Sequence, residues 1–189
     1  MTGGLGSGKS TALAALERLG AATLSTDAVV HELYAGDEVR EAVVARWGAE
    51  VAPGGTVDRA AIARHAFADP AERAWLEGLL WPLVGARVVA FREACEQRDP
   101  PPPAAIVETP LLFEAGMDAA YDATIAIVSD EAIRAARAAA RGHEAVDERA
   151  ARQLSQDEKA ARATYVVHND GSVDDLQSDL AVILNRLRR

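Results

Sequence analysis

The chain has 189 residues, of which 49% are hydrophobic and 26% are charged, and this composition predicts one soluble globular domain rather than a disordered chain. The formal net charge of −9 argues against nucleic acid or an anionic membrane as a partner, because both favour a basic surface. The sequence shows no apolar run near the ~20 residues of a membrane span and no signal peptide, and Cys95, the sole cysteine, excludes an intrachain disulfide. We therefore expect a cytoplasmic protein, and we expect it to act as a monomer.

Residues 3–10 match the phosphate-binding pattern G-x-x-x-x-G-K-[ST] in full. Glycines let the backbone curl so that successive N–H groups point at one anion, and the helix predicted for residues 11–19 adds its positive end. The pattern predicts that Lys9 reaches the β- and γ-phosphates and that the Ser10 hydroxyl binds Mg²⁺. A chance glycine-rich turn is the alternative. The pattern predicts that ATP contacts Gly4, Leu5, Gly6, Ser7, Gly8, Lys9, Ser10 and Thr11.

The rest of the chain predicts an α/β fold in which a parallel sheet is covered by helices on both faces. Residues 28–98 are expected to be almost wholly helical, with N-caps at Asp58 and Asp69 and a break at Trp81-Pro82, after which a new helix runs from 83 to 98. This helical stretch, extended to about 28–103, interrupts the sheet as an insertion within one domain, 1–189. The predicted strands are 21–24, 104–108, 123–128 and 165–168.

A hydrophobic strand normally precedes the phosphate loop, yet only Met1 and Thr2 come before Gly3. The first strand is thus largely missing from this sequence. Two residues span less than half the ~17 Å of a five-residue strand. We therefore expect the natural reading frame to extend upstream and to supply about four to eight apolar residues.

Further motifs resemble the dephospho-CoA kinase family over essentially the whole chain. The match is specific because a Pro-Leu-Leu-Phe-Glu segment follows a predicted strand and an Asn-x-Gly segment follows the last one. The matching segments include 2–11, 26–31, 57–59, 67–70, 110–114 and 166–171, with Arg149 and Gln153.

The resemblance implies a P-loop nucleotide-kinase fold with an inserted helical substrate domain, about 28–103, and a lid, about 134–156. It implies transfer of the γ-phosphoryl group of ATP, with Mg²⁺, to the ribose 3′-hydroxyl of dephospho-CoA. The alternatives are another P-loop small-molecule or nucleoside kinase, a non-catalytic nucleotide-binding relative, and a nucleotide-driven switch. No Asn-Lys-x-Asp segment of a guanine-specific switch is present.

Carboxylates at the ends of two predicted strands are the candidates for the acceptor side. Asp27 is predicted to orient the acceptor hydroxyl and accept its proton, with a helix N-cap as the alternative. Glu108 is expected to hold water around Mg²⁺ or to contact substrate, unless it only bonds a backbone N–H. Glu114 is either a substrate-domain contact or a solvated helix residue. At position 25 the family often has a second aspartate, and this chain has serine; Leu111 is a further substrate-binding candidate.

Arginines of the predicted lid are the candidates for closing over the phosphates. Arg134, Arg137 and Arg141 lie three and four residues apart on one helical face, which suits paired binding of phosphate oxygens. A solvated basic face is the alternative. The resemblance implies a catalytic role for Arg149 and nucleotide contacts for Arg137, Arg141, Asn169 and Gly171.

Two other features have competing interpretations. Trp81 stands where the family commonly has histidine, so it is either part of the core, as a lone tryptophan usually is, or an aromatic contact for adenine or the pantetheine arm. Residues 125–131 resemble a Walker B strand followed by Asp130 and Glu131. The simpler interpretation is that Ser129 caps a helix whose first turn favours acids.

Overall fold

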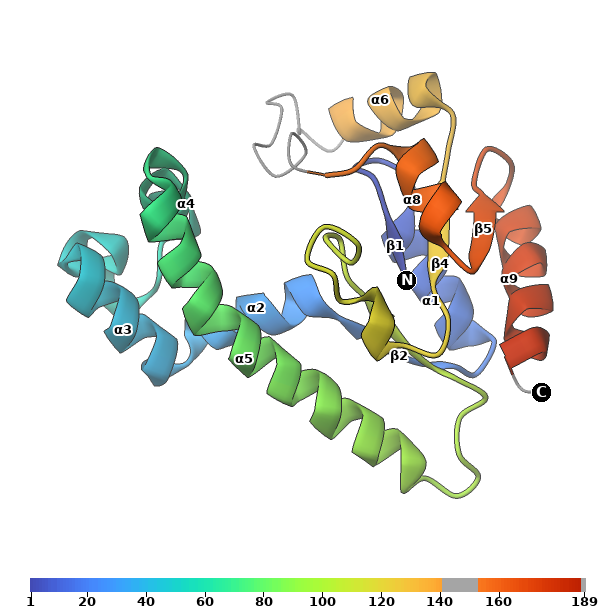
Figure 1. Ribbon diagram of the computed structural model, residues 1–189, viewed down its shortest axis with the longest axis horizontal. Coiled ribbons are helices and arrows are strands. Elements are labelled where there is room, and N and C mark those ends of the chain that lie inside the picture. The colour runs from blue at the N-terminus through green and yellow to red at the C-terminus, as the bar shows by residue number, and fades with distance from the viewer. Residues whose placement is uncertain (141–152, 188–189) are drawn as a thin grey trace. The chain divides into compact units, whose positions relative to one another are not determined.

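Figure 1 shows the computed structural model of the chain, which describes residues 1–140 and 153–187. The chain divides into two compact units, one formed by Met1–Ser25 with Ala94–Arg189 and the other by Thr26–Glu93. We call the first the phosphate-loop unit and the second the helical unit. The predicted insertion of helices between two strands corresponds to the second.

The strands of the phosphate-loop unit form two parallel sheets. β1 (Thr2–Gly3), β4 (Ile125–Val128) and β5 (Tyr165–His168) form one sheet in the order β1-β4-β5. β2 (Ala22–Ser25) and β3 (Ala105–Glu108) form the other. Four of these strands lie at the predicted positions, within two residues at each end, and their parallel pairing confirms the predicted fold class.

Met1 joins the two sheets through backbone hydrogen bonds. Its amine donates to the Val107 carbonyl at 2.7 Å, and its carbonyl accepts from the Thr109 N–H at 2.9 Å. The strands therefore follow one another in the order β2-β3-β1-β4-β5. The strand before the phosphate loop lies in the middle of this order, so the loop begins at the carboxyl edge of the sheet, where ligands of such folds bind.

Helices cover both faces of these strands. α1 (Lys9–Arg18) and α9 (Val173–Leu187) lie side by side and pack on one face, where Met1 also points (Figure 1). Because side chains alternate along a strand, Thr2 points to the opposite face, and there it meets α8 (Gln156–Arg162). The core between α1, α9 and the strands includes Leu16, Ile125, Ile127, Val167, Leu176 and Leu180.

The helical unit has its own apolar core. It contains α2 (Thr26–Ala35), α3 (Asp37–Trp47), α4 (Arg59–Ala68) and most of α5 (Pro70–Glu96). Two short 3-10 turns, Ala49–Val51 and Pro53–Gly55, connect α3 to α4. The predicted N-caps are present, since Asp58 accepts from the Ala60 N–H and Asp69 from the Ala71 N–H. The core includes Val39, Val43, Val51, Ile62, Leu76 and Leu80.

The predicted break at Trp81-Pro82 is wrong, because α5 runs through both residues as one helix. A proline inside a helix removes the hydrogen bond to the carbonyl four residues earlier. That carbonyl belongs to Gly78, which is exposed and can be hydrated, and Pro82 itself is exposed. Burial of Leu80 and Val84 on either side holds the helix together across the proline.

Of the helices in the described ranges, α5 is the one that is long and apolar enough to cross a membrane by length and composition alone. This is weak support for a membrane span, because a core helix can meet the same criteria. Leu76 and Leu80 on α5 are buried in the core of the helical unit.

The N-cap of the helix after β4 lies one residue later than predicted. α6 (Glu131–Ala139) has Asp130 as its N-cap, whose carboxylate accepts from the Ala132 N–H, so the prediction of Ser129 as the cap is wrong. The Ser129 side chain instead bonds to the loop after β5. The acids at 130 and 131 lie at the start of α6, as the capping interpretation expected.

Candidate functional site

The phosphate loop joins β1 to α1 and turns through two glycines in the left-handed region. Gly6 has φ of +75° and Gly8, the N-cap of α1, has φ of +89°, values that other residues rarely adopt. Since α1 begins at Lys9, the first N–H groups of this helix have no intrahelical partner. They are available to an anion, together with the positive end of the helix dipole.

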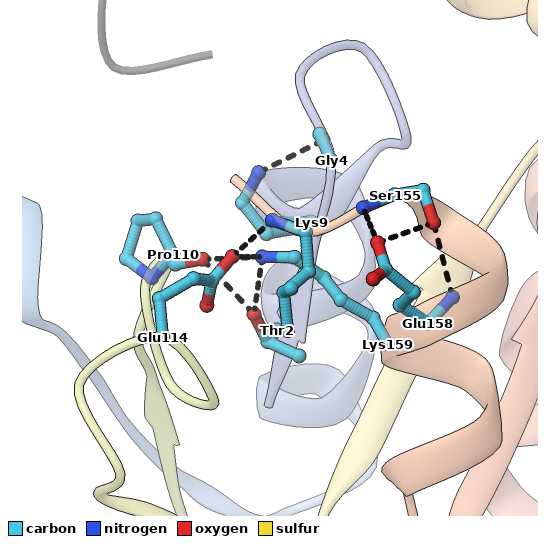
Figure 2. Close-up of polar contacts among 9 residues, drawn as sticks. Thr2, Gly4, Lys9, Pro110, Glu114, Ser155, Glu158 and Lys159 are labelled. Atoms are coloured by element: carbon cyan, nitrogen blue, oxygen red, sulfur yellow. Dashed lines mark hydrogen bonds and ion pairs between the residues drawn. The ribbon is translucent and has the colours of Figure 1, made fainter. Parts of the chain in front are cut away.

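Carbonyl groups of the loop accept hydrogen bonds from within the loop and from α1. Gly4 O accepts from the Ser7 N–H at 3.2 Å and from Lys9 Nζ at 3.1 Å (Figure 2). Gly8 O accepts from the Ala12 N–H at 2.9 Å. The Lys9 side chain therefore folds back and bonds to the start of the phosphate loop. Its predicted reach to the phosphates requires it to leave this bond.

Arg134 on α6 holds the loop from the side. Its Nε donates to Leu5 O at 3.0 Å, and its guanidinium lies over Gly4, where an added Cβ would be 3.2 Å from Nη2. A Cβ at Gly6 would be 2.5 Å from the Arg134 carbonyl, so only glycine allows α6 to approach this closely. The structure thus brings the first arginine of the predicted lid face to the phosphate loop.

Asn169, after β5, holds the loop at a third point. Its Nδ2 donates to Ser7 O at 2.8 Å, and the side chain is buried. Its own carbonyl accepts from Arg137 Nη1 at 3.0 Å and lies 2.9 Å from the Ser129 hydroxyl. A Cβ at Gly8 would overlap Asn169 Nδ2, which requires glycine there. The structure gathers Arg137 and Asn169 beside the loop; direct contact of either with nucleotide stays a prediction.

The loop after β5 is fixed in turn by Asp170 and by α8. Hydrogen bonds from the Asp130 N–H and the Ser129 hydroxyl lower the pKa of the Asp170 carboxyl below its ordinary value. Gln156 clamps Ser129, accepting from its N–H at 2.9 Å and donating to its carbonyl at 2.8 Å. Sequence reasoning missed Arg134 as a loop contact and Gln156 altogether, because both bonds link segments far apart in the chain.

A cleft of about 640 Å³ opens beside the phosphate loop. Gly4 and Leu5 form part of its lining, together with the start of α6, residues 153–157 and the end of β5. Arg134 and several carboxylates, Asp130, Glu131, Asp157 and Asp170, line it as well. Polar and apolar groups both line the cleft, and most of its charged groups are carboxylates.

Glu108 is a buried carboxylate at the carboxyl end of β3. It lies opposite Ser25 in the β2–β3 register, and the Ser25 hydroxyl donates to its Oε2 at 2.8 Å. The serine that replaces an aspartate of the family therefore binds the neighbouring glutamate. Leu111 is partly buried in the segment after β3.

Two acceptor-side candidates lie in the helical unit. Asp27 is exposed in the first turn of α2, which begins at Thr26, so Asp27 is inside the helix and the N-cap alternative is wrong. Trp81 is 49% exposed, so the interpretation of Trp81 as core is wrong and its indole is available to a ligand. Arg141 and Arg149 lie outside the described residues, and Gly171 is exposed just before α9.

The interpretation of Glu114 as a solvated helix residue is wrong. Its Oε1 is 3.0 Å from Lys159 Nζ, and the side chain is 13% exposed (Figure 2). Glu114 is a partner of a buried lysine within the phosphate-loop unit, and its contact with the substrate domain stays a prediction.

Comparison with known proteins agrees with this site. The family model described as "Dephospho-CoA kinase" matches residues 1–175. A dephospho-CoA kinase of Symbiobacterium thermophilum is 39% identical over 179 residues, which cover 92% of this chain and 74% of that protein. One of Synechococcus sp. (strain CC9902) is 40% identical over 191 residues, 97% of this chain and 94% of that protein. The crystal structure of TT1252 from Thermus thermophilus has a TM-score of 0.81 and 34% identity, covering 98% of this chain and 95% of that one.

The close approach at Gly6 predicts the effect of one methyl group. In Gly6→Ala the added Cβ meets the Arg134 carbonyl, so α6 must move away and the loop loses its side support. We expect an affinity for an ATP analogue at least about tenfold weaker, measured by calorimetry, which corresponds to ~1.4 kcal/mol.

Gly54→Ala is the matched control, because Gly54 has φ of +65° but nothing within 4 Å of an added Cβ. It carries similar backbone strain, about 1–2 kcal/mol, without the clash. Equal nucleotide affinity in the two variants would show that the contact between Gly6 and α6 is unimportant for binding.

Proposed function

We propose a role for each site residue of this chain, which belongs to the dephospho-CoA kinase family. It is a transferase that phosphorylates dephospho-CoA with ATP and yields coenzyme A and ADP. The observation that carries the proposal is the phosphate loop, whose carbonyls at Gly4, Leu5 and Ser7 all accept hydrogen bonds from side chains around it. Such a loop presents its N–H groups to the phosphates of ATP.

On the ATP side, the loop N–H groups and Lys9 bind the β- and γ-phosphates. Lys9 exchanges its hydrogen bond to Gly4 O for phosphate oxygens, and there it stabilises charge that develops as the phosphoryl group moves. Arg134 and Arg137 are close enough to the loop to add positive charge, and we assign the same role to Arg141 and Arg149. An acidic protein needs such local cations around a polyanionic nucleotide.

Magnesium fits the donor groups near the loop. Ser10 offers an exposed hydroxyl in the first turn of α1, and Mg²⁺ prefers a few protein oxygens together with phosphate oxygens and water. Among the described residues no group of three or more His, Cys, Asp or Glu side chains could hold a metal ion. When bound, Mg²⁺ would neutralise phosphate charge, and the Ser10 hydroxyl would hold it. The alternative role for Glu108, in place of substrate contact, is to orient water around this ion.

On the acceptor side, Asp27 orients the ribose 3′-hydroxyl and accepts its proton. Its carboxylate is exposed in the first turn of α2 and is free of an N-cap role. Glu108 and Leu111 contact the substrate, and Trp81 stacks on the adenine or the pantetheine arm, which its exposure allows. We also propose that the chain works as a monomer in the cytoplasm, with no nucleic-acid or membrane partner, in keeping with its net charge of −9.

The acceptor distinguishes this function from that of a related kinase. ADP release is measured with ATP, Mg²⁺ and either dephospho-CoA, adenosine or common nucleosides, and the product is identified by mass spectrometry. We expect rapid turnover with dephospho-CoA alone and formation of coenzyme A. Preferred phosphorylation of a nucleoside would make the chain a kinase of another substrate.

Lys9→Ala is expected to lower kcat by about 10²–10³ or more, the scale for loss of one preorganised charge contact in a transition state. The fold should persist, since Lys9 bonds at the surface of the loop. Arg18→Ala is the control, as it removes a cation from the other end of α1, where the guanidinium bonds to Gln177. Near-normal kcat in a folded Lys9→Ala enzyme would remove Lys9 from the mechanism.

Asp27→Asn is expected to bind ATP normally and to lose turnover, because the amide keeps the shape but cannot accept a proton. General-base loss costs about 10²–10⁴ in rate. Asp37→Asn, in the first turn of α3, is the matched control and should be unaffected. If ATP affinity collapses while kcat at saturation survives, Asp27 belongs to nucleotide or metal binding.

A further inference from the structure

Lys159 is one of two lysines in the chain, and its side chain is fully buried. A buried ammonium is costly unless every N–H finds an acceptor. Its Nζ lies 2.6 Å from Pro110 O, 3.0 Å from Glu114 Oε1 and 3.4 Å from Thr2 Oγ1 (Figure 2). Three acceptors match the three donors of an ammonium, so every N–H of the group has an acceptor.

Glu114 extends this contact to the backbone before α8. The Oε1 atom that pairs with Lys159 also accepts from the Leu154 N–H at 2.7 Å. The other oxygen, Oε2, is buried and has no hydrogen-bond partner among the described residues. The carboxylate is therefore oriented by Lys159 and Leu154 together.

Thr2 connects the same lysine to the phosphate loop. Its side chain is fully buried, and its hydroxyl donates to Pro110 O at 3.2 Å while lying within reach of Lys159 Nζ. Gly3 and Gly4 follow directly, so Thr2 sets where the loop begins. We call the five residues Thr2, Pro110, Glu114, Leu154 and Lys159 the Lys159 hub.

The hub lies behind the cleft described above. Gly4, two residues after Thr2, lines that cleft, and so does Leu154, whose N–H is bonded to Glu114. One ammonium therefore fixes the chain on the phosphate-loop side and on the side that leads into α8.

Stability alone is a poor explanation for such a pair. Replacing a buried ion pair by apolar side chains of similar volume is often neutral or stabilising, because removing two charges from water is expensive. Burial lowers the pKa of Lys159, and the hydrogen bond and charge of Glu114 oppose that shift. Unlike an apolar pair, Lys159 and Glu114 make directed hydrogen bonds to three segments of the chain, at Thr2, Pro110 and Leu154.

We propose that Lys159 is a positioning residue for phosphoryl transfer, which holds the start of the phosphate loop and the backbone at Leu154 at the separation that the nucleotide phosphates require. The expected loss of phosphoryl transfer rests on the proposed function, whereas the expected loss of affinity for an ATP analogue does not. Lys159 touches no reacting atom and acts through Thr2, Pro110 and Glu114.

The test compares Lys159→Met with Glu114→Gln and Thr2→Val, which perturb the hub more gently. We expect Lys159→Met to lower kcat/KM for ATP about 10–100-fold, the cost of a misplacement near 1 Å, and to weaken the Kd for an ATP analogue. KM for dephospho-CoA should change less than twofold. Glu114→Gln and Thr2→Val should show smaller losses of the same kind, and they carry the test if Lys159→Met does not fold.

Two controls separate positioning from stability and from charge. Arg162→Met removes an exposed cation from the same helix and should keep wild-type kinetics. Leu180→Ala opens a cavity in the core under α9 and should lower the melting temperature while kcat and KM per folded molecule stay unchanged.

The proposal is overturned if the hub variants fold and lose only melting temperature, with kcat, KM and analogue Kd as in the wild type. It is also overturned if Leu180→Ala, at equal loss of melting temperature, shows the same kinetic loss. Failure of the wild type to form coenzyme A would contradict the proposed function instead, and analogue binding by the hub variants would still decide the role of Lys159.

Discussion

The phosphate loop can present N–H groups to an anion only because its carbonyl groups are bonded elsewhere. Gly4, Leu5 and Ser7 each give their carbonyl to a side-chain donor, from Lys9, Arg134 and Asn169. The donors come from α1, from α6 and from the segment after β5, so the shape of the loop depends on three parts of the chain. Much of the phosphate-loop unit can be understood as support for these bonds.

The sheet provides the fixed end of this arrangement. β1 lies between β3 and β4, joined to β4 by parallel pairing and to β3 by the two hydrogen bonds of Met1. Met1, the residue before β1, enters the core with α1 and α9, whereas Thr2 in β1 meets Lys159 of α8 on the opposite face. Residues 1–3 together are thus held on both edges and both faces, which fixes the point where the loop begins.

Much of this could be predicted from local sequence. The strand positions and the caps at Asp58 and Asp69 depend on neighbouring residues, and the structure confirms them. Phosphate binding by residues 3–10 stays a prediction. The errors at Pro82 and Ser129 arose where tertiary contacts override local preference: burial around Pro82 outweighs its missing N–H, and Ser129 bonds to a distant loop. The pairing of Glu114 with Lys159, 45 positions apart, has no local signal at all.

Bonds from outside the phosphate loop preorganise it, and the Asn169→Leu variant measures their effect when tripolyphosphate is the ligand. Tripolyphosphate lacks base and ribose, so a contact of Asn169 with the nucleoside cannot affect its binding. Losing the bond to Ser7 O leaves a buried carbonyl unsatisfied, at about 1–3 kcal/mol, so we expect a Kd for tripolyphosphate that is weaker by roughly tenfold. An unchanged tripolyphosphate Kd in the folded variant, with ATP affinity alone reduced, would contradict this preorganisation.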